Sequence, residues 1–397
     1  MTNLFGIICL IVLGVISFFS LYQWGHAILA ILYKTSPSDQ RRAHTTRFLI
    51  LIPAHNEEDG LPETLQSLSA LQYPKDLVHI VVIADRCADD TARVARAGGA
   101  QCLERNEGPG GKGAAMSWAM QVLRKEGVVF DALVIVDADC LADSRLLEAF
   151  DDALAKGHEV QQGYNYLSNP WETPFTRVIA VTSVLRNFLF YGGKEAIGCS
   201  AMLSGTGMCL SRSVVNKHGW SAFSVAEDWE FSVSLLLNDV VIHFNPLARV
   251  FARESKGLKQ ASRQRLRWAT GKYAVMTNGA RRLFLQGLSR GKANLIDGAV
   301  TLAAPNYSSQ ASMTLFALVC SLFLSQEPVW GFLLPWSLAV LGSLGGYFLL
   351  GAMHTQSPLK TLAGIPYIAV FLPWRLAIEI LGFLGFGRKG WGRTFRS

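Results

Sequence analysis

Apolar residues are concentrated at the two ends of the chain, and the middle alternates apolar and polar segments. From Leu4 to about Tyr33 the sequence is apolar except for Gln23 and His26. About 20 such residues cross a bilayer, so we predict a transmembrane helix within residues 1–34. A cleaved signal peptide fits less well, because no Lys or Arg precedes the apolar run and the run exceeds a usual signal core.

A second apolar block, from about Ala299 to Phe386, begins with a hairpin pattern. One apolar stretch starts near Val300 and runs to Ser325, and another runs from Trp330 to Gly351 after a short turn without basic residues. We predict a transmembrane hairpin over residues 299–352, with Trp330 and Trp336 as anchors at the membrane surface.

The last apolar stretch, residues 362–386, lies in a C-terminal region (353–397) and is interrupted by prolines and charges. A single crossing would place four basic residues outside, against the positive-inside rule. They are Arg388, Lys389, Arg393 and Arg396. A re-entrant or interfacial segment, with Arg375 and Glu379 paired at i,i+4, removes this conflict, and a spanning segment stays open as the alternative.

Basic residues that follow the first apolar segment set the expected orientation. They are Lys34, Arg41, Arg42 and Arg47. By the positive-inside rule this side of the helix faces the cytoplasm. We therefore expect a multi-pass protein of the cell (inner) membrane, with the amino terminus outside and residues 35–298 forming a cytoplasmic domain that includes interfacial helices.

Composition supports a membrane protein that carries a water-soluble domain. Half of the 397 residues are hydrophobic and 17% are charged, compared with about 25% charged residues in typical soluble domains. The net charge of +7 comes from residues that flank apolar segments, which disfavours nucleic acid as a partner and favours membrane lipids. The seven cysteines are scattered without a C-x-x-C pair, as is typical of reduced cytosolic thiols.

The middle of the chain alternates strand and helix patterns. Apolar runs predict buried parallel strands at residues 48–52, 78–84 and 132–136. Helical patterns separate these runs and begin at about Gly60, Thr91 and Ala114. This order predicts an α/β fold with a doubly wound, mainly parallel sheet. Ligands bind at the carboxyl ends of strands in such sheets, and three of these ends carry polar groups: Pro53 to Glu58, Asp85-Arg86, and Asp137 to Asp139.

Asp137 and Asp139 lie one residue apart directly after an apolar strand. Hard oxygen ligands of this kind suit Mg²⁺ or Mn²⁺, which complete their coordination with water and phosphate oxygens. An isolated pair is more often a polar turn at a strand end. The position beside two other polar strand ends favours a metal site.

Residues 108–113 form a glycine-rich segment around Lys112. The segment satisfies G-x-G-x-x-G, but it lies far beyond the first strand, which argues against a Rossmann dinucleotide site. Asn106 and Gly113 stand where a Walker A loop requires Gly and Ser or Thr. We interpret the segment as a flexible loop that carries Lys112 and leads into a helix, and the N-terminus of such a helix can bind a phosphate. A simple mobile turn is the alternative.

Two later segments hold candidate catalytic groups. The acidic segment 227–230 begins an amphipathic helix, where carboxylates either complement the helix dipole or supply a general base. The segment from Gln264 to Trp268 follows several basic residues, which near a membrane usually contact lipid headgroups. Arg267 could also neutralise a diphosphate, and Trp268 could stack on a sugar face.

Taken together and in this order, the motifs resemble those of membrane-bound family 2 glycosyltransferases, of the branch that includes cellulose, chitin and hyaluronan synthases and their shorter bacterial relatives. The resemblance covers about residues 47–276. It runs through Pro53-Ala54-His55-Asn56-Glu57-Glu58, Asp85, Gly111-Lys112-Gly113, Asp137-Ala138-Asp139, Ser204-Gly205-Thr206-Gly207, Glu227-Asp228 and Gln264 to Trp268. It implies a GT-A-type fold in the cytoplasm, flanked by transmembrane helices.

The resemblance also implies a role for each matching residue. Asp228 would be the catalytic base, and Asp137 and Asp139 would bind Mg²⁺ or Mn²⁺. The donor would be bound by Pro53, Ala54, Asn56, Glu57, Asp85, Lys112, Asp137, Gln264 and Arg267, with Asp85 at the uracil. The acceptor would be bound by Gly205, Thr206, Glu227 and Trp268.

The implied activity is an inverting transfer from a UDP-sugar to a saccharide or lipid-linked acceptor at the cytoplasmic membrane face, in polysaccharide or glycolipid synthesis. A catalytically silent, nucleotide-sugar-binding membrane sensor is the alternative from another class. Three features depart from the family pattern. Arg86 follows Asp85 in place of the usual Asp-Gly, and Ala226 replaces a frequent Thr. The membrane portion is also smaller than that of the large synthases, so export of a polymer would require partner proteins.

Overall fold

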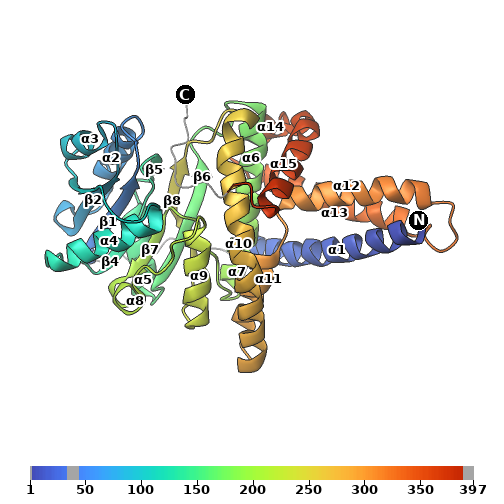
Figure 1. The fold of residues 1–397 in the computed structure, drawn as a ribbon, viewed down its shortest axis with the longest axis horizontal. Coiled ribbons are helices and arrows are strands. Elements are labelled where there is room, and N and C mark those ends of the chain that lie inside the picture. Colours follow the sequence, from blue (N-terminus) through green and yellow to red (C-terminus); the bar gives the residue numbers. More distant parts are fainter. Residues whose placement is uncertain (1, 34–43, 388–397) are drawn as a thin grey trace.

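The computed structural model describes residues 2–33 and 44–387. A wide sheet flanked by helices forms one end of the molecule, and a bundle of long helices projects from the other end (Figure 1). The long helix α10 (Leu258–Arg290) crosses the junction between the two parts (Figure 1). Seven basic residues used above to predict orientation lie outside the described residues: Lys34, Arg41, Arg42, Arg388, Lys389, Arg393 and Arg396.

Eight strands form one sheet in the order β3-β2-β1-β4-β7-β6-β8-β5. Their bounds are β1 Phe48–Ala54, β2 Val78–Asp85, β3 Gln101–Arg105, β4 Ala132–Ile135, β5 Cys140–Ala142, β6 Val160–Leu167, β7 Met208–Ser211 and β8 His243–Ala252. Strands β3, β2, β1 and β4 are mutually parallel, as are β6 and β8. Strand β7 is antiparallel to β4 and β6, and β5 is antiparallel to β8. The predicted parallel sheet is therefore the N-terminal half, and the pattern did not predict the antiparallel strands.

Helices cover both faces of the sheet and continue into the bundle. On the sheet side their bounds are α2 Leu61–Ser69, η1 Lys75–Leu77, α3 Thr91–Ala97, α4 Lys112–Lys125, α5 Leu146–Ala155, α8 Arg212–His218 and α9 Glu227–Leu237. At the junction and in the bundle they are α1 Thr2–Leu32, α6 Pro174–Val184, η2 Leu185–Tyr191, α7 Gly192–Ala196, α11 Ala293–Ala303, α12 Tyr307–Leu324, α13 Leu333–Met353, α14 Pro358–Leu362, η3 Ile365–Tyr367 and α15 Ile368–Phe383.

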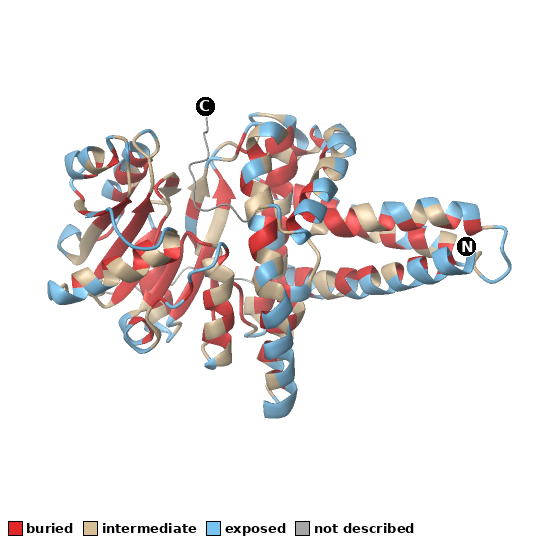
Figure 2. Ribbon diagram, viewed as in Figure 1, coloured by how far each residue is buried: buried red, intermediate tan, exposed pale blue. Residues whose placement is uncertain are grey.

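Alternate residues of β1 pack into two separate apolar layers, which is why this strand is apolar throughout. Leu49 and Leu51 face a layer formed with α4, α8 and α9. Phe48, Ile50 and Ile52 face the opposite layer, formed with α2, α3 and α5. Figure 2 shows the buried residues running along these central strands. Burial on both faces is the expected condition of parallel strands in a doubly wound sheet.

Two element boundaries differ from the predicted ones. The apolar pattern predicts that the first strand ends before Pro53, but β1 continues to Ala54. The pairing of β1 with β4 ends at Leu51. Pro53, which has no N–H to donate, lies beyond this pairing and is therefore tolerated in the strand. Helix α4 begins at Lys112, two residues before the predicted Ala114, and this start places the cation in the first turn.

Within residues 2–33 and 44–387, four segments are long and apolar enough to cross a membrane: α1, α12, α13 and residues 358–383. Helices α1, α12 and α13 run side by side as the bundle (Figure 1). Their outer faces expose large apolar side chains, among them Leu21, Phe323 and Leu338. Apolar surface of this extent suits lipid better than water.

Helices α12 and α13 pack together where a transmembrane hairpin is predicted, but the apolar stretch before them is not continuous. The chain breaks after α11 at Ala304 to Asn306, because Pro305 disfavours a helix at the residue before it. The expected boundary at residue 298 therefore falls within α11. Trp336, a predicted anchor at the membrane surface, donates its Nε1 proton to Ser17 of α1 at 3.0 Å and so packs against the bundle.

Helix α15 lies at the end of the bundle nearest the sheet and packs against α10 and α12 (Figure 1). Arg375 and Glu379 form the predicted i,i+4 ion pair, with an N–O distance of 2.5 Å. Glu379 also accepts hydrogen bonds from Tyr273 of α10 at 3.0 Å and from Asn306 at 2.8 Å. Whether the segment spans the membrane or lies at its surface stays a prediction, since residues 358–383 are also long and apolar enough to cross.

Candidate active site

The carboxyl ends of β1 and β2 are joined by hydrogen bonds between the loops that follow them. His55 Nδ1 lies 2.7 Å from the carbonyl oxygen of Asp85, and Asn56 Oδ1 accepts a hydrogen bond from the Ala88 N–H at 2.7 Å. Asn56 has a φ of 58°, a left-handed conformation that Asn tolerates better than most residues. The predicted donor segment Pro53–Glu57 is thereby held beside Asp85.

Asp85 is fully buried and lies between two arginines. Arg105 Nη1 donates to Oδ1 at 2.6 Å, and Arg86 Nη2 donates to Oδ2 at 2.8 Å. Arg105 also donates to the Pro109 carbonyl oxygen at 2.6 Å, which links this group to the glycine-rich loop. Arg105 was not predicted from the sequence, although it ends a short segment, β3, that the helix-to-strand alternation could have revealed.

Asp137 and Asp139 follow β4 at the same edge of the sheet. One ligand atom from each, together with Cys140 Sγ, lies within 4.8 Å of the others. A hard ion such as Mg²⁺ or Mn²⁺ prefers oxygen, so the two carboxylates fit it and the buried thiol does not. Because β7 is antiparallel to β4, the loop before β7 also reaches this edge, and the Asp137 N–H donates to Thr206 Oγ1 at 3.0 Å.

Lys112 connects Asp137, the loop before β7 and helix α9. Its Nζ donates to Asp137 Oδ1 at 2.5 Å and to the Gly205 carbonyl oxygen at 2.6 Å, and lies 3.9 Å from Glu227 Oε1. Burial by itself would lower the pKa of Lys112, but the carboxylates of Asp137 and Glu227 outweigh burial and raise it. Lys112 is therefore a fixed cation at the centre of the predicted site.

Glu227 and Asp228 occupy the first turn of α9, beside Lys112. A Cβ atom on Gly205 would lie 3.5 Å from both Asp228 Oδ2 and Lys112 Nζ, so this glycine keeps space open next to the carboxylate. Burial raises the pKa of Asp228 to about 6, and burial together with the Asp228 charge raises the pKa of Glu227 to about 7. Carboxyl groups shifted toward neutral pH are typical of acid–base catalysts.

Glu230 lies in the same turn but makes different contacts. Its Oε2 accepts hydrogen bonds from the N–H groups of Phe223 and Ser224 at 3.1 and 2.9 Å. Glu230 therefore holds the loop that leads into α9.

Helix α10 supplies the segment from Gln264 to Trp268. Gln264 is buried. Burial lowers the pKa of Arg267, and the negative charges of Glu227 and Asp137 partly oppose this shift. The Arg267 guanidinium therefore lies close enough to both carboxylates to interact with them electrostatically. Trp268 is 44% exposed, and the Arg265 guanidinium lies over its ring, 4.8 Å from the centroid. This exposed aromatic side chain is available for stacking.

The structure gathers six of the other fourteen predicted site residues around Lys112. They come from separate elements and are Asp137, Gly205, Thr206, Glu227, Asp228 and Arg267. Asp85 and the segment Pro53–Glu57 lie at the adjoining strand ends and are linked to the glycine-rich loop through Arg105. The functional role of each residue stays a prediction.

The parallel half of the sheet carries acidic and basic groups at its carboxyl edge, where ligands bind in folds of this kind. The family described as "Glycosyltransferase like family 2" matches residues 45–271, more than half of the chain, and the chain belongs to this family. The predicted family and the predicted class of enzyme are thereby confirmed.

Two curated relatives are similar over the same region. A probable glycosyltransferase, YdaM, of Bacillus subtilis (strain 168) is 27% identical over 235 residues, which cover 57% of this chain and 55% of that protein. A poly-beta-1,6-N-acetyl-D-glucosamine synthase of Staphylococcus aureus (strain MSSA476) is 26% identical over 241 residues, which cover 57% of this chain and 54% of that protein. The chain thus spans about half the length of the curated relatives that it matches.

Among solved structures, the chain is similar to the mannosyltransferase PcManGT from Pyrobaculum calidifontis, determined in complex with GDP-Man and Mn²⁺. The TM-score is 0.56 at 17% identity, and the match covers 96% of this chain and 98% of that one. The similarity confirms the predicted GT-A fold.

Proposed function

We propose that the protein is an inverting glycosyltransferase that moves a sugar from a UDP-sugar to a saccharide or lipid-linked acceptor at the cytoplasmic face of the cell membrane. The observation that carries this proposal is the position of Lys112, which joins Asp137 to Glu227 and lies beside Asp228. In a glycosyl transfer a diphosphate leaves and the acceptor hydroxyl loses a proton. A fixed cation can stabilise the leaving diphosphate, and a nearby carboxylate of raised pKa can accept the proton.

In the proposed mechanism Asp228 is the general base. A pKa of about 6 leaves it mostly ionised at neutral pH, and it is a stronger base than an ordinary Asp. The acceptor hydroxyl gives its proton to Asp228 as its oxygen bonds to the anomeric carbon. The bond between that carbon and the diphosphate oxygen breaks at the same time, UDP leaves with the electron pair, and the configuration inverts.

The charge of the leaving UDP requires cations that are already in place. Lys112 and Arg267 supply two of them, and the contact between Lys112 and the Gly205 carbonyl fixes the ammonium group before the donor binds. Asp137 and Asp139 fit Mg²⁺ or Mn²⁺, which when bound would neutralise diphosphate charge.

The group around Asp85 is complementary to uracil. Uracil presents one N–H between two carbonyl oxygens, and a carboxylate between two guanidinium groups offers the matching acceptor and donors. Guanine instead presents two adjacent donors beside its carbonyl and matches this order less well. Because Asp85 is fully covered, the base can enter only if the Arg86 guanidinium, whose side chain is 34% exposed, shifts from Asp85 to donate to a uracil oxygen instead.

Polysaccharide or glycolipid synthesis is the process that fits this site. The similarity to a protein named poly-beta-1,6-N-acetyl-D-glucosamine synthase supports a saccharide acceptor, and the position of α10 at the junction with the bundle supports an acceptor that stays near membrane lipids. Partner export proteins are expected if the product is a polymer. The alternative, a silent nucleotide-sugar sensor, is disfavoured because Asp228, Asp137 and Asp139 are all retained at the site.

The test uses membranes that contain the full chain, a panel of radiolabelled UDP-sugars, and GDP-mannose as the comparison donor. We expect transfer from one UDP-sugar, loss of transfer in EDTA, and recovery with Mg²⁺ or Mn²⁺. Partition of the label into organic solvent identifies a lipid-linked product, and label that stays aqueous identifies a saccharide. Transfer from GDP-mannose alone would contradict the UDP-sugar assignment, and UDP-sugar binding without any product would favour the sensor.

A further inference from the structure

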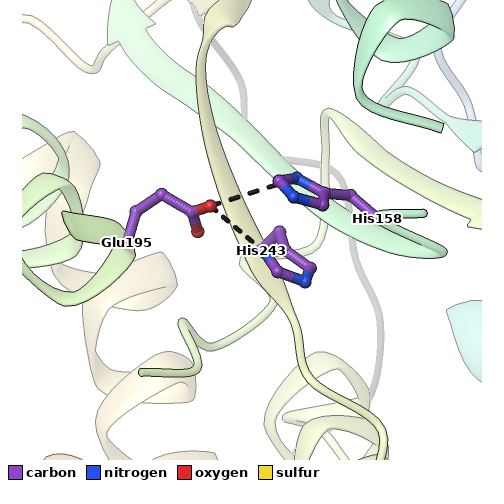
Figure 3. Close-up of side chains that lie close together, drawn as sticks. All are labelled: His158, Glu195 and His243. Atoms are coloured by element: carbon purple, nitrogen blue, oxygen red, sulfur yellow. Dashed lines mark hydrogen bonds and ion pairs between the residues drawn. The ribbon is translucent and has the colours of Figure 1, made fainter. Parts of the chain in front are cut away.

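Three potential metal ligands come together outside the candidate active site. His158 lies in the loop between α5 and β6, Glu195 lies in α7, and His243 is the first residue of β8. Figure 3 shows both imidazole rings facing the Glu195 carboxylate. Glu195 Oε1 lies 3.1 Å from His243 Nδ1 and 4.0 Å from His158 Nδ1. One ligand atom from each of the three residues lies within 4.8 Å of the other two.

The carboxylate of Glu195 is oriented by the backbone. Its second oxygen, Oε2, accepts a hydrogen bond from the Phe244 N–H at 2.8 Å, which leaves Oε1 directed at the two rings. His243 and His158 are brought together by the parallel pairing of β8 with β6, in which Gln161 lies opposite His243. The cluster is therefore set by the sheet itself and by one helix packed on it.

We propose that His158, Glu195 and His243 form a binding site for one Zn²⁺ ion that is separate from the catalytic metal site. Two imidazole nitrogens and one carboxylate oxygen are a ligand set that Zn²⁺ binds in tetrahedral geometry, with a water molecule in the fourth position. Zinc bonds of this kind place neighbouring ligand atoms about 3.3 Å apart, and the distances of 3.1 and 4.0 Å to Oε1 lie on either side of that value.

Ion binding requires one local adjustment. The two imidazole rings are stacked, with centroids 3.7 Å apart and planes 7° from parallel. In-plane lone pairs of parallel rings do not converge on one point, so at least one ring rotates about its terminal side-chain torsion when the ion binds. The His158 and His243 side chains are 30% and 23% exposed, which leaves room for this rotation and for a bound water.

The ligand chemistry separates this site from the catalytic one. Asp137 and Asp139 offer hard oxygen atoms that suit Mg²⁺ or Mn²⁺, whereas an imidazole pair selects ions such as Zn²⁺. Excess Mg²⁺ can therefore occupy the catalytic carboxylates and leave the imidazole site open in the same experiment.

The ion would connect the sheet to the membrane bundle through α7. Lys194, next to Glu195, is fully buried and donates to Asp297 at 2.5 Å and Thr301 at 2.6 Å, both on α11. Gly193 packs so closely on α1 that a Cβ atom there would lie 1.9 Å from the His26 carbonyl oxygen. One side of α7 is thus fixed to the membrane helices, and Glu195 reaches the sheet from the other side. Zinc would stabilise this connection.

The test measures Zn²⁺ binding and thermal unfolding of the full chain in detergent, after removal of metals and in excess Mg²⁺. We expect about one Zn²⁺ per chain and a rise in the unfolding midpoint with Zn²⁺. Glu195→Gln keeps the side-chain size and His243→Asn puts a smaller amide in place of the imidazole, so each replaces a ligand; each should weaken Zn²⁺ binding at least about 100-fold and remove the thermal shift. His79→Ala, on β2 outside the cluster, is the matched control and should bind Zn²⁺ like the original chain.

Two results would overturn the proposal. One is equal Zn²⁺ uptake by the original chain and both ligand variants, which would assign the ion to another site. The other is no uptake at all in Mg²⁺, together with an unfolding midpoint that responds only to pH, which would make the cluster a proton-sharing histidine pair. A cooperative thermal unfolding transition of each metal-free variant checks that the chain is folded, so a loss of Zn²⁺ alone counts as a site effect.

Discussion

Asp228 and Glu230 lie within one turn of α9, and their contacts assign them different roles. Asp228 lies beside Gly205 and Lys112, whereas Glu230 accepts two backbone hydrogen bonds. We predict that Asp228→Asn lowers turnover about 10²–10⁴-fold and leaves donor affinity nearly unchanged, because a base acts only in the transfer step. The measurement is kcat from steady-state transfer beside UDP affinity from calorimetry.

Glu230→Gln is the matched control for this substitution. Its amide oxygen can still accept the N–H groups of Phe223 and Ser224, so activity should stay near that of the original chain. Glu227→Gln should fall between the two, because Glu227 lies 3.9 Å from Lys112 and helps to hold that cation. Retention of a tenth or more of the turnover by Asp228→Asn would show that the acceptor is activated elsewhere.

The raised pKa values of Asp228 and Glu227 predict a pH dependence of known sign. Burial raises both above the usual carboxyl value of about 4, so the folded chain binds more protons than the unfolded chain between about pH 4 and 7. In that pH window the ionisation of Asp228 and Glu227 lowers the free energy of unfolding as the pH rises. Activity follows the opposite direction, because the base must be ionised, and kcat/KM should fall as pH drops through about 6.

The pH profile of kcat/KM, measured in the original chain and in Lys112→Met, checks this prediction. Loss of the cation removes a charge that favours the ionised carboxylates, so the acidic limb of the variant should move to higher pH. An activity that is flat between pH 5 and 8, or a limb that moves to lower pH in Lys112→Met, would contradict the assignment of the limb to this pair.

At the scale of elements, the sequence predicts best where burial is uniform. Strand β2 and α3 lie where the apolar and helical patterns place them, and β1 starts as predicted and runs two residues further, because both faces of this part of the sheet are covered. Strand β6 contains Gln161 and Gln162, whose buried amides bond to backbone carbonyls, so its pattern is not apolar. Its pairing partners, β7 and β8, are distant in sequence, and local periodicity does not reveal such pairings.

Helix α7 allows a direct test of how the sheet is joined to the bundle. A Cβ atom on Gly193 would lie 1.9 Å from a backbone oxygen of α1, which cannot move aside as a flexible side chain would. Gly193→Ala should therefore lower stability by about 1–3 kcal/mol, read as a lower thermal midpoint of unfolding in detergent. Gly14→Ala, at a position of α1 with open space around it, is the control and should change the midpoint little. Equal midpoints for the two variants would show that α7 does not pack on α1 this closely.

At the scale of the whole molecule, the site is assembled from segments that the sequence presents one at a time. The motifs around Asp137, Lys112 and Asp228 could be found because each has a recognisable local pattern. Arg105 could not be assigned to the site from its neighbours in sequence, since its partner Asp85 lies 20 positions earlier and the two meet only through the pairing of β2 with β3. Contacts of that kind depend on strand register, which a single sequence specifies only weakly.

The orientation of the sheet domain relative to the membrane is the remaining prediction at this scale. The positive-inside rule places residues 35–298 in the cytoplasm, and the turn between α12 and α13 then lies outside. Single added cysteines at two exposed positions test both halves: Ser69→Cys on α2 and Val329→Cys in the turn. An impermeant thiol reagent applied to intact cells should label Val329→Cys and not Ser69→Cys, and it should label both after permeabilisation.

The chain without added cysteines is the control for the seven native thiols, three of which are buried. Labelling of Ser69→Cys in intact cells, with Val329→Cys protected, would reverse the orientation and place the site outside the cell, away from a cytoplasmic pool of nucleotide sugars.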